Sequence, residues 1–264
     1  MIFTDINGVP DFESNVISRK QTNYCLLIPI INEGERIIKE LLRAKTVGID
    51  KVVDIIICDG GSSDGSTSTI KLEALGVNTL LTKIGPGKQG AQMRMGFWWA
   101  LKRGYKGFIT IDGNNKDSIE DVPSFVKKLD ESYDFIQGSR FVKGGKALNT
   151  PLLRHLAVRL IHAPIISLTA KKYFTDTTNG FRGYSKKYLT HKDVKPFRDI
   201  FSTYELLAYL SVKASQLNLK TCEIPVKRIY PKGGTVPTKI KGLAANKELL
   251  DILLKNAVGV YNVR

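Results

Sequence analysis

The chain has 264 residues, of which 42% are apolar and 25% charged, and its formal net charge is +15 at pH 7. This length allows one sizeable core. No internal repeat, low-complexity tract or Pro/Gly/Ser-rich linker divides the sequence, which excludes a repeat protein and favours one α/β domain with an elaborated C-terminal part. The positive charge predicts a negatively charged partner, such as anionic lipid, nucleic acid or a phosphorylated substrate.

The sequence predicts a cytoplasmic protein without a targeting segment. Residues 1–21 mix acidic, basic and apolar side chains, so we expect no signal peptide. We also expect no transmembrane helix, because no run of about eighteen or more apolar residues occurs. The three cysteines, Cys25, Cys58 and Cys222, lie in apolar, strand-like contexts without metal-ligand spacing. They are therefore expected to be reduced packing residues in a cytosolic setting.

Strands and helices are expected to alternate along the chain, which predicts a doubly wound, mostly parallel sheet with helices on both faces. The expected strands are 24–31, 52–58, 79–82, 107–111, 134–138 and 221–230. The expected helices are 33–44, 66–75, 89–103, 119–129, 202–217 and 243–254.

The apolar run 52–58 predicts a parallel strand that is covered on both faces. It ends in a turn with two carboxylates, Asp59 and Asp64, and with glycines that let a ligand approach the backbone. Ligands in such folds bind beyond the carboxyl ends of the strands, so this turn predicts a nucleotide-binding edge. A polar strand-to-helix loop is the alternative. Three serines are expected to cap the helix that begins near residue 66: Ser62, Ser63 and Ser66.

Two further strands end in the same way. Strand 24–31 is followed by the polar residues 32–36, and strand 107–111 by the polar residues 112–117. Three such ends converge along one edge of a parallel sheet. Carboxylates gathered there suit ribose hydroxyls and a divalent cation, because hard oxygen ligands hold magnesium or manganese beside phosphates. A hydrated, solvent-facing edge would give the same composition.

The segment Gly85-Pro-Gly-Lys-Gln-Gly90 opens a predicted helix. Glycines at a helix start present N–H groups to an anion, and Lys88 adds a positive charge, so a pyrophosphate would fit there. A flexible surface loop before an amphipathic helix is the alternative.

These motifs, in their order and spacing, resemble a known family. Ile28-Pro-Ile-Ile-Asn-Glu33, Asp59–Asp64, Gly87–Gly90 and Asp112-Gly-Asn114 resemble the nucleotide-sugar half of family 2 glycosyltransferases. Gly138-Ser-Arg140, Asp176–Arg182 and Tyr204–Leu207 resemble the dolichol-phosphate mannose synthase, or polyprenyl-phosphate glycosyltransferase, branch. The resemblance covers about residues 24–234.

The resemblance implies a GT-A fold, a nucleoside-diphosphate sugar donor and, for this branch, often a polyprenyl phosphate acceptor. It divides the chain into an N-terminal extension of unknown role (1–22), a catalytic domain (23–235) and a C-terminal helical extension (236–264). Within the catalytic domain, the nucleotide-sugar half is about 23–118 and the acceptor half about 119–235. The nucleotide residues that it implies are Pro29, Asn32, Glu33, Asp59, Gly61, Asp64 and Asp112, with Lys88 near the diphosphate. From its chemistry alone, Glu33 could as easily cap the helix beside it.

The chain departs from the family at the expected metal site. Asp112 is the first metal ligand that the resemblance implies, for Mg²⁺ or Mn²⁺. Relatives supply a second carboxylate where this chain has Asn114, and the lipid-phosphate branch has Gln where this chain has Lys116. Asn114 still offers a carbonyl oxygen, but the lost charge predicts weaker cation binding. Lys116 is a candidate to take over part of the metal's role, and Asp117 a candidate to compensate.

The acceptor residues implied by the resemblance are Arg140 and Arg154, because guanidinium binds phosphate through two parallel hydrogen bonds. An acceptor phosphate is ionised at neutral pH and needs no general base. An acceptor hydroxyl needs a carboxylate, for which Asp176 and Glu205 are the candidates. Both carboxylates also have structural alternatives, in which Asp176 pairs with Arg182 and Glu205 orients a neighbouring loop. In either case we expect one displacement with inversion at the anomeric carbon.

Residues 138–175 contain seven Lys or Arg and no Asp or Glu. Within this basic segment, apolar stretches alternate with basic side chains, as in helices that lie on anionic membranes. A helix packed on the catalytic domain with a solvated basic side is the equal alternative.

The leading hypothesis is an inverting glycosyltransferase that uses a polyprenyl phosphate at the cytoplasmic face of a membrane. The same-class alternative transfers sugar to a saccharide hydroxyl in surface polysaccharide synthesis. A non-catalytic nucleotide-sugar-binding protein is the alternative from another class. No aromatic-basic recognition motif supports a nucleic-acid partner. A homo-oligomer or a membrane-protein partner is compatible with the sequence.

Overall fold

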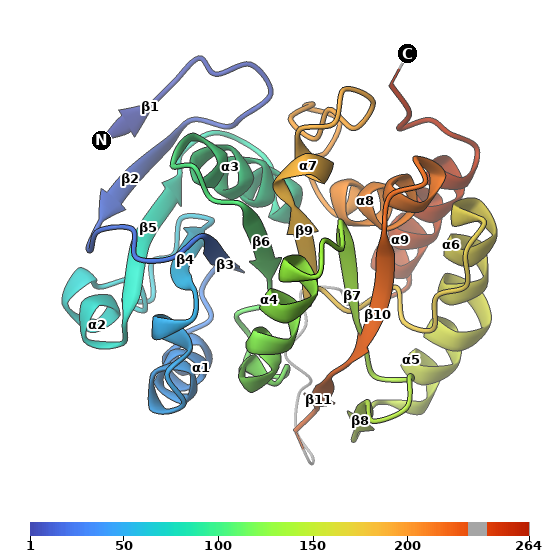
Figure 1. Ribbon diagram of the computed structural model, residues 1–264, viewed down its shortest axis with the longest axis horizontal. Helices are drawn as coiled ribbons and strands as arrows, with labels where there is room; N and C mark the ends of the chain where they lie inside the picture. Colours follow the sequence, from blue (N-terminus) through green and yellow to red (C-terminus); the bar gives the residue numbers. More distant parts are fainter. Residues whose placement is uncertain (232–241, 264) are drawn as a thin grey trace.

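A computed structural model describes residues 1–231 and 242–263, with the side chains of 242–246 left out. Nine strands form one sheet in the order β1-β2-β5-β4-β3-β6-β9-β7-β10 (Figure 1). All strands except β2 and β9 run in the same direction. The bounds are β1 Ile2–Phe3, β2 Phe12–Val16, β3 Tyr24–Ile30, β4 Asp54–Asp59, β5 Val77–Lys83, β6 Gly107–Thr110, β7 Phe135–Ser139, β9 Arg182–Ser185 and β10 Thr221–Pro225.

Helices cover both faces of this sheet, as the sequence predicts for an α/β fold. One face carries α1 (Glu35–Thr46), α2 (Thr69–Ala74) and α4 (Val122–Asp130). The other carries α3 (Gln89–Lys102), α6 (Ala163–Ala170), α8 (Glu205–Gln216) and α9 (Gly242–Ala257). Shorter helices are 3₁₀ turns at Ile49–Lys51 and Ile119–Asp121, and α7 at Lys186–Leu189.

Successive residues of the central strands pack into different cores, because side chains alternate across a sheet. In β3, Cys25 and Leu27 belong to the core under α3, whereas Leu26 and Ile28 belong to the core under α1. All four are fully buried. This explains why the strands are uniformly apolar, as expected for a sheet covered on both sides.

The first residues of the chain join the sheet. Strand β2 runs antiparallel to β5, and β1 pairs with β2. Phe12 is fully buried. The centroid of its ring lies 4.8 Å from that of Phe3, with the two rings stacked, and 6.0 Å from that of Trp98, with the two rings edge to face. Residues 2–16 therefore extend the sheet beyond β5, a role that we could not predict from the sequence.

The expected strand 221–230 is divided between two sheets. Its first part is β10 in the main sheet, and its second part, β11 (Lys227–Ile229), pairs in parallel with β8 (Lys146–Leu148) in a separate two-stranded sheet (Figure 1). The break follows Pro225, which has no N–H to continue a ladder. As a result β11 runs alongside the loop that follows β6, and Asp117 bridges to Arg228.

One long helix spans Leu152–Ala170 and consists of α5 (Leu152–Ala157), a π-helical turn at Val158–His162, and α6. It is long enough and apolar enough to cross a membrane by length and composition, and 17% of it is buried. Arg154 and Arg159 interrupt its apolar runs, so the sequence contains no unbroken run of about eighteen apolar residues, as expected, but the helix is apolar overall. Length and composition do not decide whether such a helix crosses a membrane or lies on one.

Candidate active site

The loops after β3 and β4 are joined by hydrogen bonds between side chains and backbone. The Asn32 N–H donates to Ser62 Oγ over 2.9 Å, and the Ser63 N–H donates to Asn32 Oδ1 over 2.8 Å. The Gly34 N–H donates to Asp64 Oδ2 over 2.7 Å. The predicted convergence of these two strand ends is therefore present, and Asn32 and Asp64 position one loop against the other.

The other predicted nucleotide residues lie on the same edge. Pro29 is in β3, and Gly61 has a φ of 95° that favours glycine. Asp59 is 1% exposed and its carboxylate accepts from the Ser62 N–H and hydroxyl, so it shapes the turn. Glu33 forms an ion pair with Arg36 at 2.8 Å, and the N-cap position of α1 is Gly34.

The serines do not cap α2 as expected. Helix α2 begins after Ser68, and its N-cap makes no side-chain hydrogen bond. Ser66 instead donates from its N–H and hydroxyl to Asp64 Oδ1, at 3.0 and 2.6 Å. The hydroxyls of Ser62 and Ser66 therefore donate to the carboxylates of Asp59 and Asp64 in the turn and do not cap the helix.

The start of α3 contacts the segment that precedes α8. The Lys88 N–H donates to the Ser202 carbonyl over 2.9 Å, and a Cβ on Gly90 would lie 2.6 Å from the Phe201 carbonyl oxygen. The glycine therefore permits close packing of two backbones. We expected the N–H groups at this helix start to be open to a pyrophosphate, but the Lys88 N–H is already bonded to Ser202. The Lys88 side chain itself is exposed, and Gln89 Nε2 lies 3.5 Å from Asp112 Oδ1, which places this helix end beside Asp112.

Helix α1 holds the loop after β6. Glu40, which is fully buried, accepts from the Asn115 N–H over 2.8 Å, and Arg43 donates to Asn115 Oδ1 over 2.7 Å. Behind the loop, a Cβ on Gly180 would lie 2.6 Å from Asp112 Oδ1. Asp112 therefore occupies a fixed place at the end of β6, and a glycine opposite its carboxylate is needed to make room for it.

Arg228 is the most important residue that the sequence did not reveal. Its Nη2 lies 3.1 Å from Asp112 Oδ2, and its Nη1 donates to Asp117 Oδ2. Arg228 is 6% exposed and Asp117 is 1% exposed. Pro225 marks the end of β10, but no local signal in residues 221–230 shows that the strand after it reaches Asp112. Asp117, which we considered as a compensating metal ligand, is instead the buried partner of this guanidinium.

The charges of this site shift the pKa values of its groups. Burial raises the pKa of Asp112 and the charges of Arg228 and Lys116 lower it, with a net lowering. Burial and the charge of Arg228 lower the pKa of Lys116 to about 8. Burial raises the pKa of Asp117 against the opposing effect of Arg228. The neighbouring positive charges thus favour the ionised form of Asp112.

Three basic side chains surround the ring of Tyr230, which is 2% exposed. Lys116 Nζ lies 5.1 Å from the ring centroid, and the guanidinium carbons of Arg228 and Arg154 each lie 5.8 Å from it. Arg154 Nη1 also donates to the Tyr230 hydroxyl over 3.2 Å. The predicted acceptor residue Arg154 is therefore connected to the Asp112 site through one tyrosine. We call this group the Tyr230 cluster: Asp112, Lys116, Asp117, Arg154, Arg228 and Tyr230.

Arg140 and Asp176 form a buried pair next to this cluster. Arg140 Nε and Nη2 donate to the two oxygens of Asp176 at 2.6 and 2.9 Å, and the two residues are 4% and 0% exposed. The proposed pairing of Asp176 with Arg182 is wrong, because Arg182 donates to three backbone carbonyls: those of Thr177, Asn179 and Leu207. Arg140 thus neutralises Asp176 in this structure.

Glu205 orients a neighbouring loop, which was the structural alternative for this residue. Its carboxylate accepts from the Thr203 N–H at 2.5 Å and from the Thr203 hydroxyl at 2.8 Å. It thereby fixes the segment that enters α8 and contacts the start of α3. Both carboxylates considered as general bases are therefore already engaged within the protein.

The residues at Asp112 do not fit a divalent ion held by the protein alone. Among the described residues, no group of three or more His, Cys, Asp or Glu side chains is placed to hold a metal. Asn114 Oδ1 is buried without a hydrogen-bond partner, so it is an available oxygen ligand. The neighbouring Asp112, however, already pairs with Arg228, and Lys116 adds a second positive charge. A protein site for Mg²⁺ normally gathers negative oxygen ligands.

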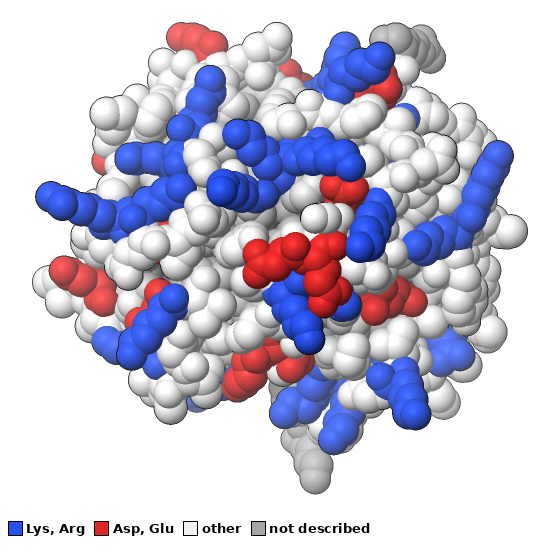
Figure 2. Space-filling view, viewed as in Figure 1, with Lys and Arg blue, Asp and Glu red and all other residues white. Residues whose placement is uncertain are grey.

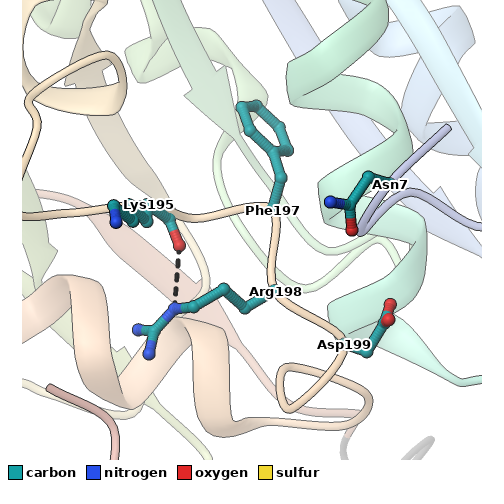
Figure 3. A pocket seen from close by; sticks show the side chains of 5 residues that line it. All are labelled: Asn7, Lys195, Phe197, Arg198 and Asp199. Carbon is teal, nitrogen blue, oxygen red and sulfur yellow. Dashed lines mark hydrogen bonds between the residues drawn. The ribbon is translucent and has the colours of Figure 1, made fainter. Parts of the chain in front are cut away.

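A separate hollow lies away from these residues. It has a cavity volume of about 420 Å³ and is lined by Asn7, Lys195, Phe197, Arg198 and Asp199 (Figure 3). Arg198 Nε donates to the Lys195 carbonyl there over 3.1 Å. The hollow contains none of the residues that the sequence predicted for catalysis or binding, so the convergent strand ends are the better candidate for the active site.

The fold is that of a class of glycosyltransferases. The family model for "Glycosyl transferase family 2" matches residues 25–191, more than half of the chain, and the protein belongs to this family. The undecaprenyl-phosphate mannosyltransferase of Micrococcus luteus is 27% identical over 206 residues, which cover 76% of this chain and 81% of the relative. The polyprenol monophosphomannose synthase of Mycolicibacterium smegmatis is 27% identical over 180 residues, 64% of each chain.

Solved structures show the same fold. Glucosyl-3-phosphoglycerate synthase from Mycobacterium tuberculosis in complex with UDP superimposes with a TM-score of 0.63 at 17% identity, over 89% of this chain and 80% of that chain. The same enzyme with Mn²⁺, UDP and glucosyl-3-phosphoglycerate gives a TM-score of 0.58 at 17% identity over the same shares. The predicted GT-A fold and the predicted family are confirmed.

We predict that Asn114→Asp tightens Mn²⁺ binding at least about tenfold, because two unit charges about 4 Å apart interact by roughly 4 kcal/mol near a protein surface. Isothermal titration calorimetry with Mn²⁺ measures this. Asn115→Asp is the matched control, because its side chain contacts Arg43. If the two variants bind Mn²⁺ alike, Asn114 is not a ligand position.

Proposed function

We propose that this glycosyltransferase moves a sugar from a nucleoside-diphosphate sugar to a polyprenyl phosphate, with inversion at the anomeric carbon. The observation that carries the proposal is the Tyr230 cluster, in which Arg154 lies on the same tyrosine as Lys116 and Arg228. A phosphate bound by Arg154 would therefore lie beside a donor bound at Asp112. The names of the relatives, which act on undecaprenyl and polyprenol phosphates, support this acceptor.

The occupied carboxylates favour a phosphate acceptor over a hydroxyl. A hydroxyl acceptor needs a general base. Asp176 is buried against Arg140, and Glu205 is bonded to Thr203, so each already has a structural role. An ionised phosphate oxygen attacks without losing a proton. The alternative acceptor, a saccharide hydroxyl, has no such support from the described residues.

The reaction is one substitution at the anomeric carbon. A bond forms between an oxygen of the acceptor phosphate and this carbon, while the bond from the carbon to the donor's β-phosphate oxygen breaks. The leaving nucleoside diphosphate takes the electron pair, so its negative charge rises and must be neutralised. No proton is transferred. The acceptor oxygen gives up one negative charge when it forms the new bond, and the leaving diphosphate gains one.

A divalent ion, Mg²⁺ or Mn²⁺, would bind at this site only together with the donor, so the reaction proposed above does not depend on a resident ion. The solved relative binds Mn²⁺ together with UDP. In this chain Asp112 and Asn114 offer two oxygen ligands, and the diphosphate would complete the set, since Mg²⁺ is often bound through one or two protein groups plus substrate phosphates.

We further propose that the helix Leu152–Ala170 places the protein on the cytoplasmic face of an anionic membrane. Its apolar side chains are open to solvent, with Leu153 83% and Leu160 69% exposed. Lys and Arg side chains are spread over the face in Figure 2, while Asp and Glu gather in small groups. Because Arg154 belongs to this helix, a lipid phosphate held at the membrane surface would come directly to the Tyr230 cluster.

A transfer assay tests the proposed function. Purified protein is incubated with a panel of nucleotide sugars and with either polyprenyl phosphate or oligosaccharide acceptors, in the presence of Mn²⁺. We expect one donor to give a polyprenyl-phosphate sugar of inverted anomeric configuration by nuclear magnetic resonance. A product found with oligosaccharide acceptors alone would establish the hydroxyl alternative, and nucleotide binding without turnover would indicate a binding protein.

We predict that Arg154→Ala raises the KM for polyprenyl phosphate roughly ten- to a hundredfold and leaves donor affinity nearly unchanged, because a lost hydrogen bond to a charged group costs about 1.5–3 kcal/mol. Arg159→Ala, an exposed position of the same helix, is the control. Arg140→Ala should instead lower the free energy of unfolding by about 3–5 kcal/mol, since it leaves Asp176 buried and unpaired. Steady-state kinetics and urea unfolding measure these effects, and an unchanged KM in Arg154→Ala would contradict the acceptor assignment.

We predict that the protein sediments with vesicles containing phosphatidylglycerol and that added salt weakens this binding by screening. Replacing Leu153 and Leu160 together by Ser should weaken binding at least about tenfold, because each buried leucine contributes roughly 1.5–3 kcal/mol. Ile70→Ser changes a residue that is 81% exposed on α2 and serves as the control. Equal sedimentation of both variants would place the membrane contact elsewhere.

A further inference from the structure

The donor site of this chain contains positive charges fixed by the protein itself. Arg228 contacts Asp112 at 3.1 Å, and Lys116 lies with Arg228 on the ring of Tyr230. We propose that Lys116 and Arg228 are the resident counter-charge for the donor diphosphate, so that the nucleotide binds and the sugar is transferred without a divalent ion. This inference rests on the proposed function and concerns how the same site works.

The position of Arg228 is determined by the backbone. The Ile229 N–H donates to the Lys116 carbonyl over 2.8 Å, and the Ser118 N–H donates to the Lys227 carbonyl over 2.9 Å. These bonds align β11 with the loop after β6, so the positions of Arg228, Lys116 and Asp112 are fixed relative to one another. Groups held in this way need no rearrangement when charge develops on a leaving group, which is the condition for effective electrostatic stabilisation.

The balance of charge at the site opposes a divalent ion. Asp117 is buried and is the partner of Arg228, so Asp112 is the carboxylate left near the donor. Asn114 is neutral and adds no negative charge. The Tyr230 cluster contains three basic side chains, Lys116, Arg154 and Arg228, and two carboxylates, so its formal net charge is positive. This balance favours a diphosphate over a divalent cation.

The two cations suit different tasks. A guanidinium presents several N–H donors in a fixed plane, and an ammonium presents three donors on a flexible stem. Arg228, held between two carboxylates, keeps Asp112 and the loop in place and contributes a fixed charge. Lys116 is 4% exposed and supplies ammonium donors whose place beside Asp112 is fixed by the backbone of its loop. We therefore assign Lys116 direct contact with the donor, and treat Arg228 as the residue that positions Asp112.

The first test is nucleotide binding by the unmodified protein. Isothermal titration calorimetry with UDP and with GDP is performed in excess EDTA and again with Mn²⁺. We expect one nucleotide to bind in EDTA with an affinity within about tenfold of that with Mn²⁺. The transfer assay in EDTA should likewise keep activity.

The second test replaces the charge of Lys116 by a neutral amide. Lys116→Gln should weaken nucleotide binding in EDTA by about ten- to a hundredfold, as expected for loss of a charged hydrogen-bond donor. Binding with Mn²⁺ should change much less, because the ion then supplies the missing charge. Lys127→Gln, which removes the same charge from an exposed position on α4, is the matched control.

A test of Arg228 must also change Asp117, because the two residues form a buried ion pair. Arg228→Gln alone would leave Asp117 uncompensated, so it is combined with Asp117→Asn, and Arg228→Lys is the conservative variant. The double variant should bind nucleotide more weakly in EDTA and respond more strongly to Mn²⁺, and Arg228→Lys should recover part of the loss. Thermal melting checks that each variant is folded.

The possible outcomes are distinguishable. Binding in EDTA that depends on Lys116 supports the inference. Nucleotide binding by the unmodified protein only with Mn²⁺, or a Lys116→Gln variant that binds normally in EDTA, overturns it and leaves the proposed function standing. Binding of no nucleotide under either condition contradicts the proposed function itself.

Discussion

The site depends on one guanidinium between two carboxylates. Arg228 contacts Asp112 on one side and the buried Asp117 on the other, and so joins the loop after β6 to β11. A buried charge is costly unless it is paired, so this arrangement is stable only while all three groups are present. It also determines what the site attracts. With Lys116 and Arg154 close to the same tyrosine, the cluster gathers positive charges that suit negatively charged ligands.

Much of the fold follows from the sequence because the pattern is strong. Uniformly apolar runs such as β3 and β4 predict a sheet that is buried on both faces, and polar residues after them predict the edge where a ligand binds. The helices between them were predicted to within a few residues. The departures arise where tertiary contacts override local signals. Pro225 ends β10, and the following residues pair with a different part of the chain.

The candidate site was only partly predictable for the same reason. Asp112, Asn114 and Arg154 are local features that a motif can identify. Arg228 and Tyr230 join them through pairing between residues more than a hundred positions apart, which no periodicity reveals. Arg140 and Asp176 were recognised as individual residues, but their mutual ion pair was not. A sequence shows which groups are present, and the fold decides which of them neutralise each other.

The antiparallel strand β2 has a consequence for association. An exposed strand edge offers unpaired N–H and C=O groups to another chain, and proteins commonly protect such edges. Here β2 covers β5, and β1 in turn covers the start of β2. At the opposite edge, Lys172 donates to the Thr221 carbonyl and the Thr175 N–H donates to Glu223, so side chains and loop cover β10. Within the described residues, the main sheet therefore presents edges that are short or partly covered, which disfavours association of a second copy by continuing the sheet.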